Sequence, residues 1–463
     1  MKKILLLCIL ISTAYAVSVP YTPYFELKTI NAFNTLPYVY GGAVIDFNSD
    51  GYPDIVMFQG EPGCPPPGQA LKAYQNNKDG TFTDVTDRVF AGATMQGVDS
   101  YVVEDFNGDG KKDILLTNGG LDGAPMGGEQ MRIFIQTADG RLVDETSTRL
   151  PIEKTVGMAV SVADIAHRGC LDIFLDTFAS GENGPRFLIN DGTGHFVNDR
   201  TRLPKDISTA ATPCSYGILV DIRNNGLPDL VLGEILYNEI LTNDGTGHFY
   251  RGSNYKLPAK LGAVNELGPN NSGVTDIKAI DVNGDGYKDI IMAFRNPVTQ
   301  FSGIQVLLNN KDGTFTDITA SAGFNWTADD YIYKLEVIDA NADGRPDILA
   351  YETSASYTGP RLFLNNGDGT FTEATNYLDN GTPLNAPQSN WWWFTCIADF
   401  NQDGVPDVFM TDHNIIKIGL GQKVIGKSTR RTLSPLDNLQ PILNNDTYER
   451  QRIQSETILN TIQ

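Results

Sequence analysis

Short apolar runs alternate with polar, glycine-containing turns along most of this chain. One stretch carries four such runs, at Tyr101–Phe106, Asp113–Thr117, Met131–Gln136 and Arg141–Thr146. Runs of this length, rich in β-branched and aromatic residues and bounded by Gly or Asp, are typical of β-strands. The turn before the last run contains Asp139-Gly140, a dipeptide that supplies the positive φ of tight hairpins. We therefore predict four short antiparallel strands in this stretch.

The same arrangement returns at a nearly constant interval, marked by an acidic loop between the first and second runs. The first loop is Asp46–Asp54, and related loops start at Asp105, Asp164, Asp221, Asp281, Asp339 and Asp399. The steps between them are 59, 59, 57, 60, 58 and 60 residues. Independent domains would not give this regularity, whereas a stack or ring of equivalent units would. We number these repeats as units 1 to 7.

A second recurring feature is the turn between the third and fourth strands. It reads Asn-Asn-Lys-Asp-Gly-Thr-Phe at 76–82 and returns in related form at Asn190–Phe196, Asn309–Phe315 and Asn365–Phe371. Four-stranded antiparallel sheets repeated in this way are typical of a β-propeller, whose blades surround a central channel. The sequence thus predicts an all-β fold, a seven-bladed β-propeller with four-stranded antiparallel blades.

The two ends of the repeat region predict how the propeller closes. Unit 7 has three strands, at Phe394–Asp399, Asp407–Thr411 and Ile415–Leu420, and no segment for a fourth strand follows them. Before unit 1, however, Tyr24–Thr29 has the character of a fourth strand. We expect this N-terminal strand to complete the last blade and close the ring. The main alternative, an open β-solenoid, would leave terminal edges unpaired.

The acidic loops have the composition of a calcium site. Five of them follow the pattern D-x-N-x-D-G-x-x-D, with side-chain oxygens at positions 1, 3, 5 and 9 and a backbone carbonyl available at position 7. Several hard oxygens within one tight turn suit Ca²⁺, and the Gly at position 6 permits the chain reversal. An EF-hand is excluded, because it needs Glu at position 12, where these loops have Met57, Leu116, Met292, Ala350 and Met410. The alternative is a set of Asx-turns without metal, in which three carboxylates would repel one another.

These loops, the segment Tyr40–Val44 and the Asn-Asn-x-Asp-Gly-Thr-Phe turns resemble the FG-GAP/VCBS repeats of integrin α-subunit propellers and of many secreted bacterial proteins. The resemblance covers roughly residues 22 to 420. It implies a structural Ca²⁺ between the first and second strands of each intact blade, about five ions in this chain. The implied ligands, with the position-7 residue using its carbonyl, are Asp46, Asn48, Asp50, Tyr52, Asp54, Asp105, Asn107, Asp109, Lys111, Asp113, Asp281, Asn283, Asp285, Tyr287, Asp289, Asp339, Asn341, Asp343, Arg345, Asp347, Asp399, Asn401, Asp403, Val405 and Asp407.

The loops of units 3 and 4 depart from the pattern. In unit 3, position 3 is Ala166 and position 5 is Arg168, and in unit 4 position 3 is Arg223. Our hypothesis is that each arginine places its guanidinium near the carboxylates, where a metal ion would otherwise lie. Seven tightly bound calcium ions per chain would refute it.

The charge of the chain limits its partners. With 56 acidic and 35 basic residues, the net charge is −21. A molecule this acidic repels the phosphates of nucleic acids and anionic membrane surfaces, so we expect neither as a partner. The five intact loops hold 15 of the aspartates, and five Ca²⁺ ions would offset ten of these charges.

Both ends of the chain differ from the repeat region. Residues 1–16 combine two lysines, an apolar run and the ending Ala14-Tyr15-Ala16, the layout of a secretory signal peptide. The run is too short for a transmembrane helix, and no later run is long enough for one. We therefore expect a secreted protein, with the periplasm as the alternative location, made of a propeller at 17–421 and a polar tail at 422–463. Four cysteines lie beyond residue 16 and leave one disulfide open, namely Cys64, Cys170, Cys214 and Cys396.

Three classes of function remain: a binding module, an enzyme and a purely structural scaffold. The motifs G-x-S-x-G and H-E-x-x-H are absent, and the four histidines lie in turns and loops without a catalytic pattern. Carboxylate pairs for glycoside chemistry stay open, because aspartates are abundant. We favour a binding or adhesion module for a glycan or an extracellular protein over a carbohydrate-active lyase or hydrolase on the propeller face.

Aromatic residues near the starts of first strands are the candidate ligand-binding groups. They lie on or close to the face opposite the acidic loops, and the candidates are Tyr331, Tyr333, Trp391, Trp392 and Trp393. Aromatic rings can stack on sugars or anchor a protein partner. The alternative is that they fill the interface between blades. Three successive tryptophans in a strand cannot all point inward, however, because side chains alternate between its faces.

Overall fold

The structure is a computed structural model of the chain. It describes residues 25–29, 39–59, 69–95, 97–118, 130–153, 157–177, 184–208, 214–234, 238–252, 257–258, 274–296, 301–324, 326, 331–353, 358–374, 394–411 and 416–421. The predicted signal peptide, the polar tail and Trp391, Trp392 and Trp393 lie outside these residues.

The strands follow the predicted units in chain order. Unit 1 contains β2 (Val39–Ile45), β3 (Asp54–Gln59), β4 (Gln69–Asn76), β5 (Phe82–Asp84) and β6 (Thr94–Met95), and unit 2 contains β7 (Val98–Glu104), β8 (Asp113–Asn118), β9 (Arg132–Gln136) and β10 (Leu142–Asp144). Unit 3 contains β11 (Gly157–Ala163), β12 (Asp172–Thr177), β13 (Arg186–Asn190) and β14 (Phe196–Asp199), and unit 4 contains β15 (Cys214–Val220), β16 (Asp229–Glu234), β17 (Asn238–Asn243) and β18 (Phe249–Arg251). Unit 5 contains β19 (Val274–Ile280), β20 (Asp289–Asn296), β21 (Phe301–Asn309) and β22 (Phe315–Asp317). Unit 6 contains β23 (Tyr331–Ile338), β24 (Asp347–Thr353), β25 (Thr358–Asn365) and β26 (Phe371–Glu373), and unit 7 contains β27 (Phe394–Ala398), β28 (Asp407–Thr411) and β29 (Ile416–Gly421).

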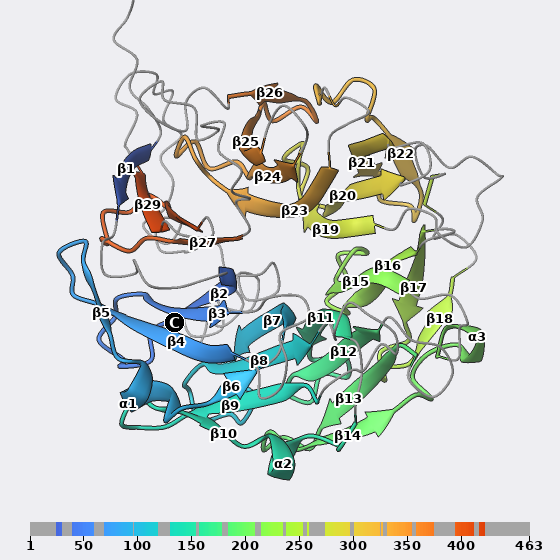
Figure 1. The fold of residues 1–463 in the computed structure, drawn as a ribbon. Helices are drawn as coiled ribbons and strands as arrows, with labels where there is room; N and C mark the ends of the chain where they lie inside the picture. The colour runs from blue at the N-terminus through green and yellow to red at the C-terminus, as the bar shows by residue number, and fades with distance from the viewer. Residues whose placement is uncertain are drawn as a thin grey trace, which may run out of the picture.

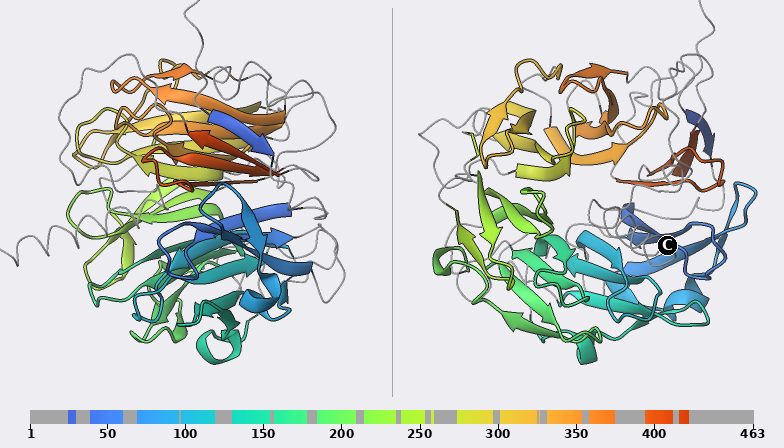
Figure 2. Two further views of the ribbon diagram at one scale, coloured as in Figure 1. Left: turned by 90° about the vertical axis from the view of Figure 1, so that its left-hand side faces the viewer. Right: turned by 180° about the vertical axis from the view of Figure 1, so that it is seen from behind.

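The units are arranged around a common centre, with the first strand of each unit innermost (Figure 1). First strands of neighbouring units contact one another from β27 through β2, β7, β11, β15 and β19 to β23. Every strand pair within the described sheets is antiparallel. The predicted all-β propeller with antiparallel blades is thus confirmed. Figure 2 shows the same arrangement from the side and from behind.

Burial falls from the inside of a unit to its outside, and the sequence follows it. All six residues of β12 are buried, and so are the five of β13. The outermost strands β5, β22 and β26 bury only their first residue, a phenylalanine. This gradient explains why second strands are near-continuous apolar runs, whereas β5, β22 and β26 are one phenylalanine followed by polar residues.

Six of the described sheets have the four strands predicted for a blade, but the sheet of unit 1 has five. The predicted four-stranded blade is present in unit 1 as β2-β3-β4-β5, and the short strand β6 is an addition to it. Its third strand, β4, is eight residues long, and β5 pairs only with its last three residues. The short strand β6 pairs with the other end of β4, at Gln69 and Ala70. The outer edge of β4 is thus covered by two short strands in place of one.

The N-terminal strand pairs with the last strand of the repeat region, as we expected. β1 (Phe25–Thr29) lies antiparallel to β29, with Phe25 opposite Gly421 and Thr29 opposite Lys417. The sheet of unit 7 therefore has the strand order β1-β29-β28-β27, and its outermost strand comes from the other end of the chain.

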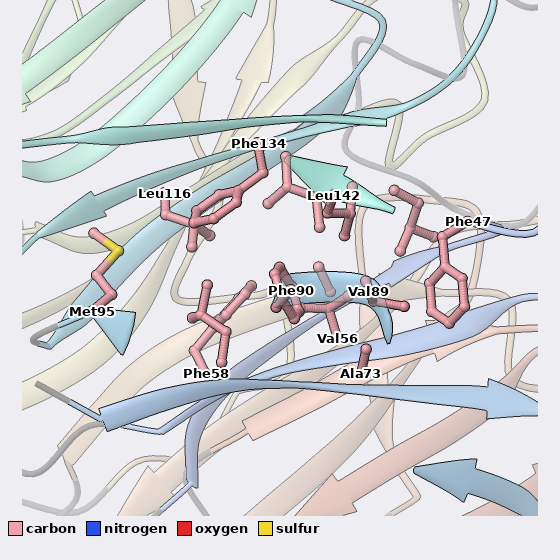
Figure 3. Close-up of a cluster of buried hydrophobic side chains, with 14 of the residues drawn as sticks. Phe47, Val56, Phe58, Ala73, Val89, Phe90, Met95, Leu116, Phe134 and Leu142 are labelled. Atoms are coloured by element: carbon pink, nitrogen blue, oxygen red, sulfur yellow. The ribbon is translucent and has the colours of Figure 1, made fainter. Parts of the chain in front are cut away.

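Hydrophobic side chains fill the spaces between neighbouring sheets. One of these clusters joins unit 1 to unit 2 and includes Phe47, Phe58, Phe90 and Phe134 (Figure 3). Other clusters join each later unit to the next, and one joins unit 7 to unit 1 through residues such as Phe400 and Ile55. The cores of this protein thus lie between the blades.

A buried side-chain amide also joins five units to the unit before them. It belongs to the residue at the end of the third strand, which is Asn76, Gln136, Asn190, Asn243 or Asn309. Each NH₂ donates to the backbone carbonyl of position 2 in the preceding acidic loop, at 2.8–2.9 Å, and the acceptors are Phe400, Phe47, Phe106, Ile165 and Ile222. We call this contact the inter-unit amide bond. It fixes the acidic loops of units 7, 1, 2, 3 and 4 against the next blade.

Three short helices complete the described structure, α1 (Thr86–Phe90), α2 (Thr146–Arg149) and α3 (Lys205–Ser208). They follow the fourth strands of units 1 to 3, and Val89 and Phe90 of α1 pack into the core between units 1 and 2. Within the described ranges, no helix has both the length and the apolar character needed to cross a membrane.

Candidate metal sites

The five intact acidic loops share one set of internal hydrogen bonds. In unit 1, the Asp46 carboxylate accepts the N–H groups of Asp50 and Gly51, at 3.1 and 2.8 Å. Asn48 Oδ1 accepts the Asp50 N–H at 2.9 Å, and Asp50 Oδ1 accepts the Tyr52 N–H at 2.9 Å. The loops of units 2, 5, 6 and 7 repeat these bonds. These are the bonds of Asx-turns, and they give the five loops the same local shape.

Glycine at position 6 is required by the backbone. Gly51 has a φ of 85°, and the equivalent glycines of the other intact loops have φ between 82° and 87°. A side chain disfavours this left-handed region, so the sharp reversal of the loop depends on Gly.

The aspartate at position 9 is the buried member of each loop. Asp54, Asp113, Asp289, Asp347 and Asp407 start the second strands and have no exposed surface. Their Oδ1 atoms accept a backbone N–H from the end of the third strand at 2.7–2.9 Å, as Asn309 donates to Asp289. In unit 1 the other oxygen, Asp54 Oδ2, is buried and has no hydrogen-bond partner among the described residues.

Burial and like charge make the position-9 carboxylates costly to ionise. Burial raises the pKa of Asp54 to about 7, and the Asp46 and Asp50 carboxylates add to the effect. Burial likewise raises the pKa of Asp347 to about 8, with Asp339 and Asp343 contributing. A bound cation would favour the charged form of these groups. Asx-turns explain the shape of the loop, but they supply no counter-ion for the buried carboxylate at position 9.

A basic side chain lies beside the position-5 aspartate in four of the intact loops. Lys78 Nζ is 3.2 Å from Asp50, Lys111 Nζ is 3.4 Å from Asp109, and Lys311 Nζ is 3.3 Å from Asp285. In unit 6, Arg345 pairs with Asp343 and also donates to the carbonyl of Asn365. The side chains of these ion pairs are 24–45% exposed, so each pair contributes little to stability.

In unit 3, the predicted contact between the arginine and the loop carboxylates is confirmed. Arg168 pairs with the buried Asp172 at position 9, and its second NH group donates to the carbonyl of Asn190 at 2.8 Å. The Arg168 N–H and the Gly169 N–H still bond to Asp164 at position 1, so the loop keeps its shape.

Unit 4 makes the same contacts from a different position in the loop. Arg223 binds Asp229 through two nitrogens, each at 2.8 Å, and donates to the carbonyl of Asn243 at 2.7 Å. Asp229 is fully buried, and Arg223 is mostly buried. Burial still raises the pKa of Asp229, to about 6, although Arg223 opposes the effect.

The donor chemistry of the intact loops fits Ca²⁺, because every predicted ligand is a hard oxygen and one buried carboxylate oxygen lacks a partner. The side chains are not gathered into a finished cage, however. In the described part of the chain, no three His, Cys, Asp or Glu side chains lie closely enough to hold a metal ion. Calcium binding would therefore require carboxylates of one loop to turn toward a common point.

Comparison with known sequences adds a family to this geometry. A sequence profile described as an FG-GAP-like repeat matches residues 46–116, 105–175, 221–292, 281–350 and 353–410. The chain belongs to the FG-GAP-like repeat family. Four of the five FG-GAP matches begin at position 1 of an acidic loop, namely Asp46, Asp105, Asp221 and Asp281. The FG-GAP pattern therefore includes the arginine-containing loop of unit 4 as well as intact loops.

Comparison with whole proteins is less specific. No curated protein matches the chain. Among solved structures, the FG-GAP chain is similar to a lectin from Agrocybe aegerita, described as specifically recognising non-reducing terminal N-acetylglucosamine. The two chains are 20% identical, and the match covers 73% of this chain and 79% of the lectin with a TM-score of 0.47.

The candidate ligand-binding aromatics are only in part among the described residues. Tyr331 and Tyr333 lie at the start of β23, the innermost strand of unit 6. The Tyr333 ring packs against Tyr351 with centroids 6.1 Å apart, and it borders the core between units 6 and 7. For Tyr333, this position matches the alternative in which the side chain fills the space between blades.

Charged and phenolic side chains form a cluster near the centre, and its charged members were not predicted from the sequence. We call it the axial cluster, and its members are Tyr101, Tyr216, Asp276, Lys278, Lys334 and Glu336 from β7, β15, β19 and β23. Lys278 lies 3.2 Å from Asp276, and Lys334 lies 2.7 Å from Glu336. Asp276 also accepts the Leu335 N–H at 2.8 Å, so the cluster ties unit 5 to unit 6.

The axial cluster reaches across the centre of the molecule. Lys334 Nζ of unit 6 lies 5.9 Å from the ring centroid of Tyr101 in unit 2. Burial raises the pKa of Tyr216 well above its usual value, and the Asp276 carboxylate adds to this shift. In β23 the charged residues of the axial cluster alternate with apolar residues. This alternation is typical of an ordinary half-exposed strand, so the sequence does not indicate the cluster.

Proposed function

We propose that this protein is a secreted, calcium-stabilised β-propeller that serves as a binding or adhesion module for a glycan or an extracellular protein. In this proposal the propeller has seven blades, and the pairing of β1 with β29 closes it. The observation that carries the calcium part is the buried position-9 aspartate, which lies beside two further carboxylates in each of five loops.

The architecture supports a binding role on the face opposite the acidic loops. In unit 1 the acidic loop joins β2 to β3, and the turn from β4 to β5 lies beside it, because Lys78 reaches Asp50. The connection from β3 to β4 must therefore leave from the other end of the blade. Connections on a rigid scaffold are where recognition usually lies.

The calcium part is tested by equilibrium dialysis followed by elemental analysis, with thermal unfolding in calcium and in EGTA as a second readout. We expect about five ions per chain and a higher unfolding midpoint in calcium. For Kd values of about 10⁻⁴ to 10⁻³ M, ~10 mM free Ca²⁺ stabilises the fold by about 1.4 to 2.7 kcal/mol per site. No bound calcium and equal midpoints in both buffers would contradict the proposal.

A pair of variants separates ligand loss from general damage. Asp285→Asn should keep the Asx-turn, because Asn225 at this position in unit 4 still accepts the Leu227 N–H at 3.0 Å. It removes one charged ligand, so we expect one weakened calcium site. Asp312→Asn is the control, since Asp312 makes the same kind of turn with Thr314 outside the acidic loops. The control should bind calcium like the wild type.

The binding part is tested on a glycan array with the protein in calcium and again after chelation. Glycan binding that is lost on chelation, while circular dichroism shows the fold partly retained, would support a calcium-dependent lectin-like module. Absence of binding in both conditions would exclude the glycan and leave the protein partner to be tested by cell-surface binding.

A further inference from the structure

We infer that Arg168 and Arg223 are built-in replacements for calcium, so that units 3 and 4 form a metal-independent part of the propeller between metal-dependent neighbours. The inference rests on the calcium part of the proposed function and deepens it. It assigns a different counter-ion to two of the seven loops.

The first argument is that two unrelated loop positions deliver a cation to the same place. Arg168 stands at position 5 of its loop and Arg223 at position 3. Both guanidinium groups nevertheless contact the position-9 aspartate and the carbonyl at the end of the third strand. A surface ion pair formed by chance would have no reason to repeat this pair of partners.

The second argument is burial. Asp172 and Asp229 have no exposed surface, like the position-9 aspartates of the intact loops. A buried carboxylate needs a counter-charge, and removal of one partner from such a pair is strongly destabilising. The planar guanidinium of Arg223 satisfies both oxygens of Asp229 at once, a geometry that lysine cannot provide.

The third argument comes from the ligands that the two loops lack. Unit 3 has Ala166 at position 3 and Arg168 at position 5, so two of the side-chain oxygens are missing. Unit 4 lacks only the oxygen at position 3, where Arg223 stands. Both loops keep the position-1 aspartate and its bonds to the loop backbone. The loop fold is therefore preserved without the ligand set of a calcium site.

Unit 6 shows the contrast with an arginine that is not such a replacement. Arg345 also donates to the carbonyl at the end of the third strand, Asn365, at 2.8 Å. Its ion pair goes to Asp343 at position 5, however, and its side chain is 45% exposed.

The difference between the two loops gives a test with opposite expected results. The double variant Arg223→Asn/Asn225→Asp supplies the oxygen at position 3 and the charged ligand at position 5, so unit 4 then has the ligand set of an intact loop. We expect this variant to bind one more calcium ion than the wild type, six in place of five. Its unfolding midpoint should fall in EGTA and recover in calcium. Arg168→Ala leaves unit 3 without oxygens at positions 3 and 5, so its midpoint should fall in both buffers and its calcium count should stay at five.

Arg141→Asn is the matched control, because Arg141 forms an exposed ion pair with Asp139 outside the acidic loops. It should change neither the calcium count nor the calcium dependence of the midpoint. The count is measured by equilibrium dialysis with elemental analysis, and the midpoint by differential scanning calorimetry. The count for the wild type also tests the inference without any substitution, should a variant fail to fold.

Seven ions in the wild type would overturn the inference and leave the proposed calcium dependence standing. So would an Arg223→Asn/Asn225→Asp variant that binds five ions and unfolds like the wild type in EGTA. A wild type that binds no calcium would overturn the proposed function itself, and this inference with it.

Discussion

The inter-unit amide bond offers a direct measure of how strongly neighbouring blades depend on one another. In unit 5, Asn309 Nδ2 donates to the Ile222 carbonyl of unit 4 at 2.8 Å and to the Lys288 carbonyl at 3.1 Å. Its Oδ1 accepts the Lys311 N–H at 2.9 Å. Asn309→Ala removes all three bonds and leaves the buried Ile222 carbonyl without its partner.

The expected loss follows from these contacts. A buried polar group left unsatisfied costs about 1 to 3 kcal/mol, and each of the other two bonds contributes roughly 0.5 to 1.5 kcal/mol. Water can replace part of the latter, because Lys311 is exposed. We therefore expect Asn309→Ala to lower the free energy of unfolding by about 2 to 4 kcal/mol.

The neighbouring residue in the same turn supplies the control. Asn310 is exposed, and its amide bonds only to Thr314 and Thr316 within the hairpin. Asn310→Ala should cost less than about 1 kcal/mol. A third variant, Asn309→Gln, should lose less stability than Asn309→Ala, because in unit 2 Gln136 makes the same bond at 2.9 Å.

Urea unfolding followed by circular dichroism, at one fixed calcium concentration, measures the three variants against the wild type. Equal losses for Asn309→Ala and Asn310→Ala would refute the reasoning, since the two differ mainly in the bond to the preceding unit. A Gln variant as unstable as the Ala variant would show that packing at this site outweighs the hydrogen bond.

Three further outcomes are expected. Phe134 is fully buried between units 1 and 2, and its ring lies edge-on to Phe90 with centroids 5.5 Å apart. Phe134→Ala should therefore lower the free energy of unfolding in urea by about 3 to 5 kcal/mol. Ile152→Ala, at an exposed site, is the control and should lower it by less than about 0.5 kcal/mol. Burial alone would raise the pKa of Glu336, but Lys334 and Lys278 outweigh burial and hold the pKa below 4.5. The contribution of the charged Glu336 to stability is therefore present above pH 4.5 and is lost as the pH falls through the lowered pKa. The midpoint of Glu336→Gln should therefore depend less on pH between 3 and 5 than that of the wild type, and parallel curves would contradict this. Cys396 is buried, and burial raises the pKa of its thiol. Iodoacetamide should therefore alkylate Cys396 only after unfolding, as measured by peptide mass spectrometry. Rapid labelling of the native protein would contradict this.

The repeat spacing and the turn chemistry were enough to predict the strands closely. The strand predicted at Asp407–Thr411 is β28 with the same bounds, and the one predicted at Tyr24–Thr29 is β1, which begins one residue later. Such agreement arises because each strand is bounded by Gly, Asp or Asn residues that the turns need. The strand β6 was missed, since two residues that pair with one end of β4 leave no periodic pattern.

The acidic loops were equally readable, because their Asx-turns are made by residues close together in sequence. Contacts between units were not. The inter-unit amide bond joins residues that lie far apart in the chain, such as Asn309 and Ile222, and an Asn before a turn is already expected for turn reasons. The axial cluster depends on the way the first strands converge at the centre, and a single strand such as β23 gives no sign of it.

The pairing of β1 with β29 also sets an order on folding during synthesis. Almost the whole described chain lies between these two strands, so β1 leaves the ribosome long before its partner exists. Until then β1 has no edge to pair with, and Ile55 and Met57 of unit 1 lack Phe409 and Ile418 of unit 7. The entropy of joining such distant segments makes this contact a late one. A nascent chain would thus expose the apolar side chains of unit 1 that face unit 7 until translation is nearly complete. That surface is where a chaperone would be needed most.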